Sequence, residues 1–312
     1  MNWKLKADVQ RGCAALPWGG EDVYYLLQRA FGDVQRNPHP LSMLEECARL
    51  VHCVREAGLS VEGKRMLEVG TGRRLDMPIG FYLAGAASTI TLDLHRYLKP
   101  GLVMGGIDEI RRNRELVRGY FAPLTETSGL ERRLEAVCSV RKFADLPGLT
   151  HIDYRAPGDA AATGLPAGSI DIHTSYTVFE HIPRPVLKAI LMEANRVLAP
   201  DGVALHHIDP SDHFAQVDGA ISPINFLQFS PQQWANYAGN QFAYHNRLRA
   251  DGYAEIYREC GHEILQWTPK LDGRCRKLLD DGFPLDPEFR GIPPNGLCTT
   301  VLHVLSRPGR RQ

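Results

Sequence analysis

The chain has 312 residues, of which 44% are hydrophobic and 23% are charged, an ordinary composition for a globular protein. Its 36 lysine and arginine residues balance 36 aspartate and glutamate residues, and this zero net charge argues against a nucleic-acid-binding protein, which usually carries a basic excess. No apolar run approaches the roughly 18 residues that a membrane span requires, and residues 1–22 lack the apolar core of a signal peptide, so we expect a cytoplasmic protein.

The N-terminal part of the chain predicts helices. Apolar residues recur at helical spacing in a short segment at 22–31 and in a longer one at 41–57, which Gly58 ends. We expect residues 1–60 to form a helical cap and residues 61–312 to form the main domain.

The main domain begins with a short apolar strand at 65–69, followed by a helix at 78–85 and a β-branched strand at 89–94. The next segment, 97–146, contains the stretches "IDEIRRNRELVRGYFAPL" and "LERRLEAVCSVRKF", which predict two amphipathic helices with arginine-rich outer faces. Since this segment is long for one crossover, we interpret it as an insertion between the second and third strands.

Strands and helices alternate again after this insertion, and a second insertion is expected at about 210–250. Alternation with short links predicts an α/β fold, namely a doubly wound, mostly parallel seven-stranded sheet with helices on both faces. The remaining predicted elements are strands at 150–156, 169–177, 202–209, 262–269 and 297–307, and helices at 184–198 and 251–261.

The stretch "LEVGTG" (67–72) ends the first strand in a Gly-x-Gly turn, which lets a ligand approach the backbone closely. A dinucleotide fingerprint needs a third glycine, and this sequence has Arg73, Arg74 or Leu75 there. Asp93 ends the second strand, where an acidic side chain accepts hydrogen bonds from both hydroxyls of a ribose. The turn therefore predicts a nucleoside ligand without a pyrophosphate.

Four blocks in this order, "MLEVGTG", "TLDLH", "GDAAATGLPAGSIDIHTSYTVFEHI" and "EANRVLAPDGVALHHID", resemble the class I, Rossmann-like superfamily of S-adenosylmethionine-dependent methyltransferases, in its small-molecule branch. The resemblance covers residues 65–210, and the later text "IDPSDHF", "NFLQFS" and "NRLR" extends it without giving a substrate. It implies S-adenosylmethionine as the cofactor. It also implies methyl transfer to an oxygen or nitrogen atom of a small molecule, such as a glycan precursor or a secondary metabolite.

The same resemblance implies which residues contact the cofactor. Asp93 would hold the ribose, and Asp159 would bind the exocyclic amine of adenine. Arg73 and Arg74 either help to hold the methionine carboxylate or are surface charges on an irregular turn. The predicted cofactor-binding residues are Glu68, Gly70, Thr71, Gly72, Asp93, Leu94, Asp159, Ala160, Ser175 and Tyr176.

Histidines and carboxylates follow the two strands that should face the transferable methyl group. A hydroxyl acceptor benefits from a general base, and histidine is best matched to neutral pH. His181 is the first candidate, with a structural or cofactor-lid role as its alternative, and His213 and Asp209 come next. Glu180 either orients His181 or lines the pocket.

The second insertion is a candidate substrate lid. Its aromatic and amide side chains suit a polar small molecule, and its arginines suit a phosphate or carboxylate, although the aromatics could equally pack against the sheet. The predicted substrate-binding residues are Phe214, Trp234, Tyr244, Asn246 and Arg249.

No metal site is expected from the sequence. The histidines and carboxylates from His206 to His213 match no standard metal-binding spacing, and His206 and His207 point to opposite faces of a strand. The seven cysteines are scattered without a CxxC pair, which predicts free thiols.

Two other functions stay open. A nicotinamide-dependent oxidoreductase could use a similar sheet, although the missing third glycine and the "GDA" block count against it. A non-catalytic protein that kept the nucleoside pocket would bind the cofactor without turnover.

Overall fold

The computed structural model describes residues 1–31 and 39–309. At its centre lies a seven-stranded sheet with the order β3-β2-β1-β4-β5-β7-β6. β7 runs antiparallel to both of its neighbours, and the other adjacent strands are parallel. The strands are β1 (Arg65–Val69), β2 (Ser88–Leu92), β3 (Ile152–Arg155), β4 (Ile170–Tyr176), β5 (Leu198–Ile208), β6 (His262–Leu271) and β7 (Thr299–Pro308). The predicted α/β fold with a mostly parallel seven-stranded sheet is confirmed.

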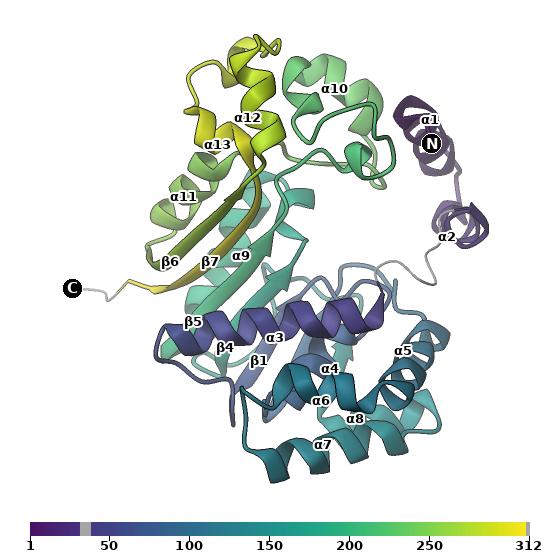
Figure 1. Ribbon diagram of the computed structural model, residues 1–312, viewed down its shortest axis with the longest axis vertical. Helices are drawn as coiled ribbons and strands as arrows, with labels where there is room; N and C mark the ends of the chain where they lie inside the picture. Colours follow the sequence, from purple (N-terminus) through teal and green to yellow (C-terminus); the bar gives the residue numbers. More distant parts are fainter. Residues whose placement is uncertain (32–38, 310–312) are drawn as a thin grey trace.

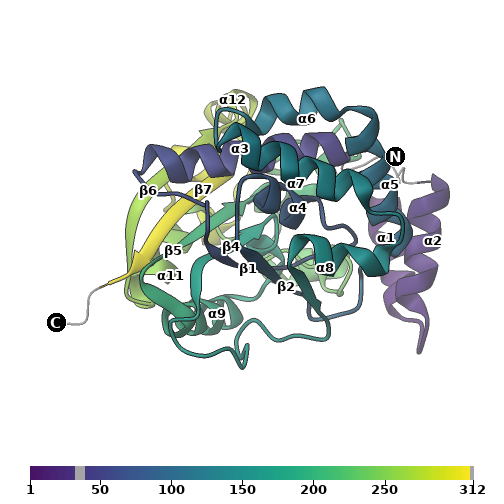
Figure 2. The ribbon, with the colours of Figure 1, turned by 90° about the horizontal axis from the view of Figure 1, so that it is seen from below.

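Helices cover both faces of this sheet, as Figures 1 and 2 show. Successive residues of β1 point to opposite faces, so Met66 packs into one apolar core and Leu67 into the other. Burial on both faces is what a parallel sheet needs, and it explains why these strands are almost continuously apolar. One face carries α3 (Pro40–Glu56), α4 (Asp76–Leu83), α5 (Pro100–Arg112), α6 (Arg114–Phe121), α7 (Thr127–Ser139) and α8 (Leu146–Thr150), and the other carries α9 (Arg184–Val197) and α11 (Ala250–Glu259).

The remaining elements gather at the carboxyl edge of the sheet, around the second insertion (Figure 1). They are α1 (Trp3–Ala14), α2 (Gly20–Phe31), η2 (Phe179–His181), η3 (His213–Gln216), η4 (Asn225–Gln228), α10 (Pro231–Ala238), α12 (Gly273–Asp280), η5 (Pro287–Phe289) and α13 (Pro294–Cys298). The short η1 (Phe143–Asp145) instead leads directly into α8.

The expected N-terminal cap divides into two parts. α3 belongs to the helical layer on the sheet, where Leu44 and Val54 are buried. α1 instead packs on the second insertion: Trp3 lies in a third apolar cluster with Phe214 and Trp234, and its backbone N–H donates to Oδ2 of Asp218 at 3.0 Å. α1, a helix that the sequence pattern did not predict, therefore helps to bury the aromatic residues of the insertion, together with Phe289 and Leu297.

The first insertion contains three main helices, where two were predicted. The first predicted helix breaks at Asn113, whose backbone leaves the helical region and whose Nδ2 donates to the Glu109 carbonyl at 2.9 Å. Arg114 and Arg118 pair with Glu131 across α6 and α7, so part of the arginine-rich surface joins these helices. Neither these helices nor any other helix in the described ranges is long and apolar enough to cross a membrane.

β5 begins at Leu198, earlier than the predicted start at residue 202, because Pro200 and Asp201 lie within the strand where its pairing with β4 is irregular. The register jumps from Ile170 opposite Leu198 to Ile172 opposite Val203. Extra residues on one strand bend it locally.

Candidate functional site

The carboxyl ends of five strands bring the predicted site residues to one edge of the sheet. Val69 is paired with Leu92 and with Ser175, and Tyr176 is paired with His207. The loops that follow β1, β2, β4 and β5 are therefore neighbours, and β3 places its own loop beside that of β2. Ligands of doubly wound sheets bind in this position.

The glycine turn after β1 is held by β2. The backbone N–H groups of Gly70 and Thr71 both donate to the carbonyl of Leu92, at 2.8 and 3.2 Å. Gly70 has a φ of +86° and Gly72 a φ of +66°, which other residues adopt only with strain. A Cβ on Gly70 would lie 2.3 Å from Cγ2 of Val178, whereas a Cβ on Gly72 would meet no atom within 4 Å. The absence of a side chain at Gly70 thus makes room for Val178 in the loop after β4. At Gly72 the space where a Cβ would lie is open.

Glu68 lies below this turn with its side chain buried. The hydroxyl of Thr91 donates to its Oε2, and Oγ1 of Thr71 lies 2.6 Å from Oγ1 of Thr91. Burial raises the pKa of Glu68 to about 8, against the opposing effect of the Thr91 hydrogen bond. Glu68 is therefore connected to the turn through two threonine hydroxyls.

The two arginines after the turn are not plain surface charges. Arg73 donates to Oε1 of Gln28 on α2, and its guanidinium lies 4.9 Å from the ring centre of Tyr25. Arg74 is buried and donates to the carbonyl of Leu102 at 3.1 Å. Both arginines thus tie the turn to the helices beside it.

Asp93 and the loop after β3 form the next part of this edge. Oδ2 of Asp93 accepts a hydrogen bond from the Gly72 N–H at 2.8 Å, and its carbonyl accepts one from the Gly158 N–H at 2.8 Å. Burial raises the pKa of Asp93, and the Gly72 hydrogen bond opposes this shift.

Leu94, the next residue, is 61% exposed. The exposed Asp159 caps its own loop by accepting from the Ala161 N–H at 2.8 Å, and Ala160 between them is buried.

A cluster of carboxylates and imidazoles lies beyond β4 and β5. Nε2 of His213 is 3.3 Å from Oδ2 of Asp209 and 3.9 Å from Oε1 of Glu180. Burial alone would lower the pKa of His213. The nearby carboxylate of Asp209 raises it by more, so the pKa of His213 lies above its ordinary value. Glu180 has no accessible side-chain surface, and burial raises its pKa to about 8.

Two further histidines complete this cluster. The His181 ring centre is 4.9 Å from that of His213, and its Nδ1 lies 2.9 Å from the Tyr244 carbonyl. Loss of hydration within the cluster, together with the nearby His213, lowers the pKa of His181 to about 4, although the residue is exposed at the surface. His245 is buried, with its ring centre 5.1 Å from that of His213. The sequence prediction missed His245, because it lies far along the chain and matches no motif.

Most of the predicted substrate-binding residues have structural contacts instead. Arg249 is buried and donates to the carbonyls of Pro210, Leu297 and Thr299. Asn246 donates to the carbonyls of Phe179 and Ile182, and so fixes the segment that contains Glu180. Phe214 and Trp234 lie in the aromatic cluster under α1, and Tyr244 holds His181 through its backbone carbonyl.

The predicted strand-end residues Ser175 and Tyr176 also face inward. Ser175 is fully buried, and its hydroxyl has no hydrogen-bond partner among the described residues. The ring centre of Tyr176 is 4.3 Å from that of His207. His207 and His206 contact different neighbours, His303 and His173 respectively, which agrees with their predicted opposite directions.

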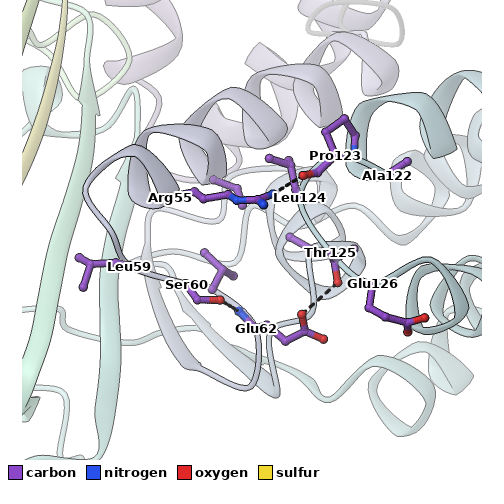
Figure 3. A pocket seen from close by; sticks show the side chains of 12 residues that line it. Arg55, Leu59, Ser60, Glu62, Ala122, Pro123, Leu124, Thr125 and Glu126 are labelled. Atoms are coloured by element: carbon purple, nitrogen blue, oxygen red, sulfur yellow. Dashed lines mark hydrogen bonds between the residues drawn. The ribbon is translucent and has the colours of Figure 1, made fainter.

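Two surface pockets lie away from this cluster. One, of about 480 Å³, is close to the amino ends of β1 and β2, where Arg55 donates to the Pro123 carbonyl and Thr125 donates to Glu62 (Figure 3). The other, of about 560 Å³, lies between α2 and α5. The first is at the wrong edge of the sheet for the usual ligand position, and its polar groups already bond to each other.

Comparison with known proteins adds one family match. Residues 119–206 match the family model of a methyltransferase domain. The matched stretch runs from α6 into β5 and includes Glu180 and His181. No curated protein sequence matches the chain.

Several solved structures are similar to this chain at low sequence identity. A presumed sarcosine dimethylglycine methyltransferase from Galdieria sulphuraria is 16% identical, with a TM-score of 0.47 over 85% of this chain and 86% of that one. The [4+2]-cyclase SpnF is 16% identical, with a TM-score of 0.43 over 84% and 81%. An S-adenosylmethionine-dependent methyltransferase from Mesorhizobium loti is 13% identical, with a TM-score of 0.41 over 82% and 96%.

Proposed function

We propose that this chain, which its methyltransferase domain identifies as a class I S-adenosylmethionine-dependent methyltransferase, methylates an oxygen or nitrogen atom of a small molecule. The pairing of His213 with Asp209 at the end of β5 carries the proposal, because it offers a base where the acceptor would lie. A glycan precursor or a secondary metabolite is the class of acceptor that we favour. The family match gives no support to a nicotinamide-dependent oxidoreductase or to a non-catalytic protein.

The residues around the glycine turn fit the cofactor. The open side of Gly72 lets a ligand approach the backbone, and Asp93 keeps lone pairs beyond the one that the Gly72 N–H uses. We assign the ribose hydroxyls to Asp93 and the adenine to the exposed Leu94 with Asp159 and Ala160. The amino-acid end would lie at the Gly70–Gly72 turn, above the buried Glu68.

Bound S-adenosylmethionine would supply a methyl carbon attached to a positively charged sulfur. The acceptor atom would attack this carbon in line, and the electron pair of the broken carbon–sulfur bond would stay on the sulfur. The chain has to hold the acceptor and remove its proton. Nε2 of His213 faces Oδ2 of Asp209 at 3.3 Å, and this contact favours a proton on Nε2, which leaves Nδ1 as the basic atom. As the bond to carbon forms, the acceptor's proton passes to Nδ1, and Asp209 stabilises the resulting imidazolium.

The structure favours His213 over His181 as this base. The pKa of His181 is lowered to about 4, so its imidazole is a weak base, and its Nδ1 is engaged by the Tyr244 carbonyl. The pKa of His213 is raised by Asp209, which brings it closer to the range where a base works best at neutral pH. His181 then lines the site.

Several features favour a small acceptor. Glu180 is fully buried and His213 is 26% exposed, so within the cluster the accessible surface lies mainly at His181. The second insertion and α1 pack together over the same edge of the sheet (Figure 1). A site with so little of His213 accessible suits a small acceptor.

The test combines binding with turnover. Calorimetry with S-adenosylhomocysteine should detect binding, and Asp93→Ala should weaken it about tenfold or more, because two hydrogen bonds to a ribose would be lost. Asp153→Ala, a change at an exposed aspartate on β3, is the matched control. Radiolabelled S-adenosylmethionine offered with hydroxyl- and amine-bearing small molecules should then yield a labelled product. Absence of S-adenosylhomocysteine binding would contradict the proposal.

A further inference from the structure

Three metal-binding side chains converge in the cluster beyond β4 and β5. Glu180 and His181 belong to η2, and His213 begins η3. One donor atom from each of these residues lies within 4.8 Å of the other two. This group differs from the histidines and carboxylates between His206 and His213 that were considered from the sequence. Glu180 and His181 are about 30 positions away from His213 in the chain, and the sheet brings them together.

The carboxylate of Glu180 lacks the partners that a buried carboxylate needs. Its side chain is inaccessible to solvent, and neither Oε1 nor Oε2 has a hydrogen-bond partner among the described residues. Buried carboxylates are otherwise hydrogen-bonded, paired or bound to a metal. The neighbouring Asp209, by contrast, accepts hydrogen bonds from the backbone and hydroxyl of Ser211. Glu180 therefore faces the cluster with no well-formed hydrogen bond among the described residues, although Nε2 of His213 is 3.9 Å away and the backbone N–H groups of Glu180 and Asp209 lie near its carboxylate.

The spacing of the cluster matches a coordination sphere. Metal–ligand bonds of about 2.0–2.2 Å place neighbouring ligands roughly 3–4 Å apart. Oε1 of Glu180 is 3.9 Å from Nε2 of His213, and Oδ2 of Asp209 is 3.3 Å from the same nitrogen. The third donor, a ring nitrogen of His181, lies within 4.8 Å of the other two donor atoms.

The surroundings of the histidines also suit a metal. Metal-binding histidines usually donate their second ring N–H to a carbonyl or a carboxylate, which fixes the tautomer. Nδ1 of His181 is 2.9 Å from the Tyr244 carbonyl, which leaves Nε2 as its available lone pair. Nε2 of His245 lies 3.4 Å from the Asp209 carbonyl, so His245 supports the backbone of Asp209.

We propose that Glu180, His181 and His213 bind a divalent first-row transition metal ion and leave a further coordination position open. Two imidazoles and one carboxylate form a donor set that suits Zn²⁺. The proposal rests on the proposed function for its role: an ion here would bind the acceptor hydroxyl and help it to lose its proton. The ion would take the Nε2 lone pair of His213, so His213 would no longer be the base, and the proton of the acceptor hydroxyl would pass to the neighbouring carboxylate of Asp209.

The first experiment measures the metal without any turnover. The full chain, treated with a chelator and desalted, is titrated with Co²⁺, whose visible absorption reports bound nitrogen and oxygen ligands, and Zn²⁺ is then used to displace it. We expect one ion per chain. Glu180→Gln and His181→Ala should each weaken Co²⁺ binding roughly 100-fold or more. His303→Gln changes a histidine that is paired with His207 on the sheet, and it should bind Co²⁺ with unchanged affinity.

A second measurement separates this proposal from the proposed function. S-adenosylhomocysteine affinity is measured on the same proteins, and Glu180→Gln should retain it, which also shows that the variant is folded. Cobalt binding that is absent, or that is equal in Glu180→Gln, His181→Ala and the wild type, would overturn the metal site and leave the proposed function standing. Stoichiometric cobalt binding without S-adenosylhomocysteine binding would support the metal site and contradict the proposed function.

Discussion

His213 and Asp209 face each other after β5, with Nε2 of the imidazole 3.3 Å from Oδ2 of the carboxylate. Ser211 holds the other oxygen of Asp209 through its backbone N–H at 3.0 Å, so Oδ2 stays directed at the imidazole. A carboxylate in this position selects one histidine tautomer and stabilises the protonated ring. The same pair accounts for the opposite shifts of the two groups, since the pKa of His213 is raised and that of Asp209 is lowered despite burial.

The first prediction concerns this pair. We expect His213→Gln to lower kcat for methyl transfer by about 10²–10⁴-fold, the range of a lost general base. The affinity for S-adenosylhomocysteine should stay the same, because the proposed cofactor contacts lie on other loops. Initial rates with a labelled methyl donor and calorimetry give the two numbers. A kcat close to that of the wild type, with or without added metal, would remove His213 from the reaction.

The second prediction compares the two glycines of the turn. Gly70→Ala adds a Cβ at a φ of +86° and within 2.3 Å of Val178, so both strain and overpacking oppose it. We expect it to lower the free energy of unfolding by about 2–5 kcal/mol. In Gly72→Ala only the backbone strain at a φ of +66° opposes the new side chain, so we expect the free energy of unfolding to fall by about 1–2 kcal/mol. Urea unfolding of both variants measures the difference.

A double variant identifies the clash as the cause. Val178→Ala removes the two methyl groups that the new Cβ would meet. Val178→Ala should therefore lower the free energy of unfolding less in the Gly70→Ala background than in the wild type. If the losses from the two single variants simply added up in the double variant, the clash would be relieved in another way.

The sheet could be predicted from sequence because its signals are local. Strand–helix alternation, the glycine turn and Asp93 are each visible in a short window of residues, and the register of β1 and β2 then places Asp93 beside Gly72. The partnership of Arg73 with Gln28 and Tyr25 could not be predicted, because it depends on where α2 lies.

The role of the second insertion was harder to predict for the same reason. Aromatic side chains suit both a ligand site and a core, and the choice depends on whether another element covers them. Trp3, on an unpredicted helix, covers Phe214 and Trp234. The position of His245 beside His213 likewise depends on the path of a chain segment without regular structure.

The third prediction follows from the contacts of Arg249. Its guanidinium donates to three backbone carbonyls in the interior, so Arg249→Met would leave these acceptors without partners. We expect a loss of about 3–5 kcal/mol in the free energy of unfolding. Arg258→Met, at an exposed position near the end of α11, should change it by less than about 0.5 kcal/mol. A stable Arg249→Met variant with only a raised KM would instead indicate contact with the acceptor.

The last prediction uses the buried carboxyl of Glu68, whose pKa is raised to about 8 by burial. Between the ordinary value of 4.5 and about 8, the unfolded chain has released a proton that the folded chain retains. The contribution of Glu68 to the free energy of unfolding therefore falls as the pH rises through this window, by at most about 1.4 kcal/mol per pH unit. Glu68→Gln keeps an acceptor for Thr91 without the ionisation, so it should gain stability relative to the wild type from pH 5 to pH 8.

Urea unfolding at several pH values measures this difference directly. The free energy of unfolding of Glu68→Gln minus that of the wild type should rise across the window and level off above the raised pKa. Glu45→Gln, an exposed change on α3, controls for the loss of one carboxylate. Parallel profiles for Glu68→Gln and the wild type would mean that Glu68 is ionised in the folded protein at neutral pH. The Thr71–Thr91 hydroxyl pair would then have to stabilise a buried negative charge directly beneath the glycine turn.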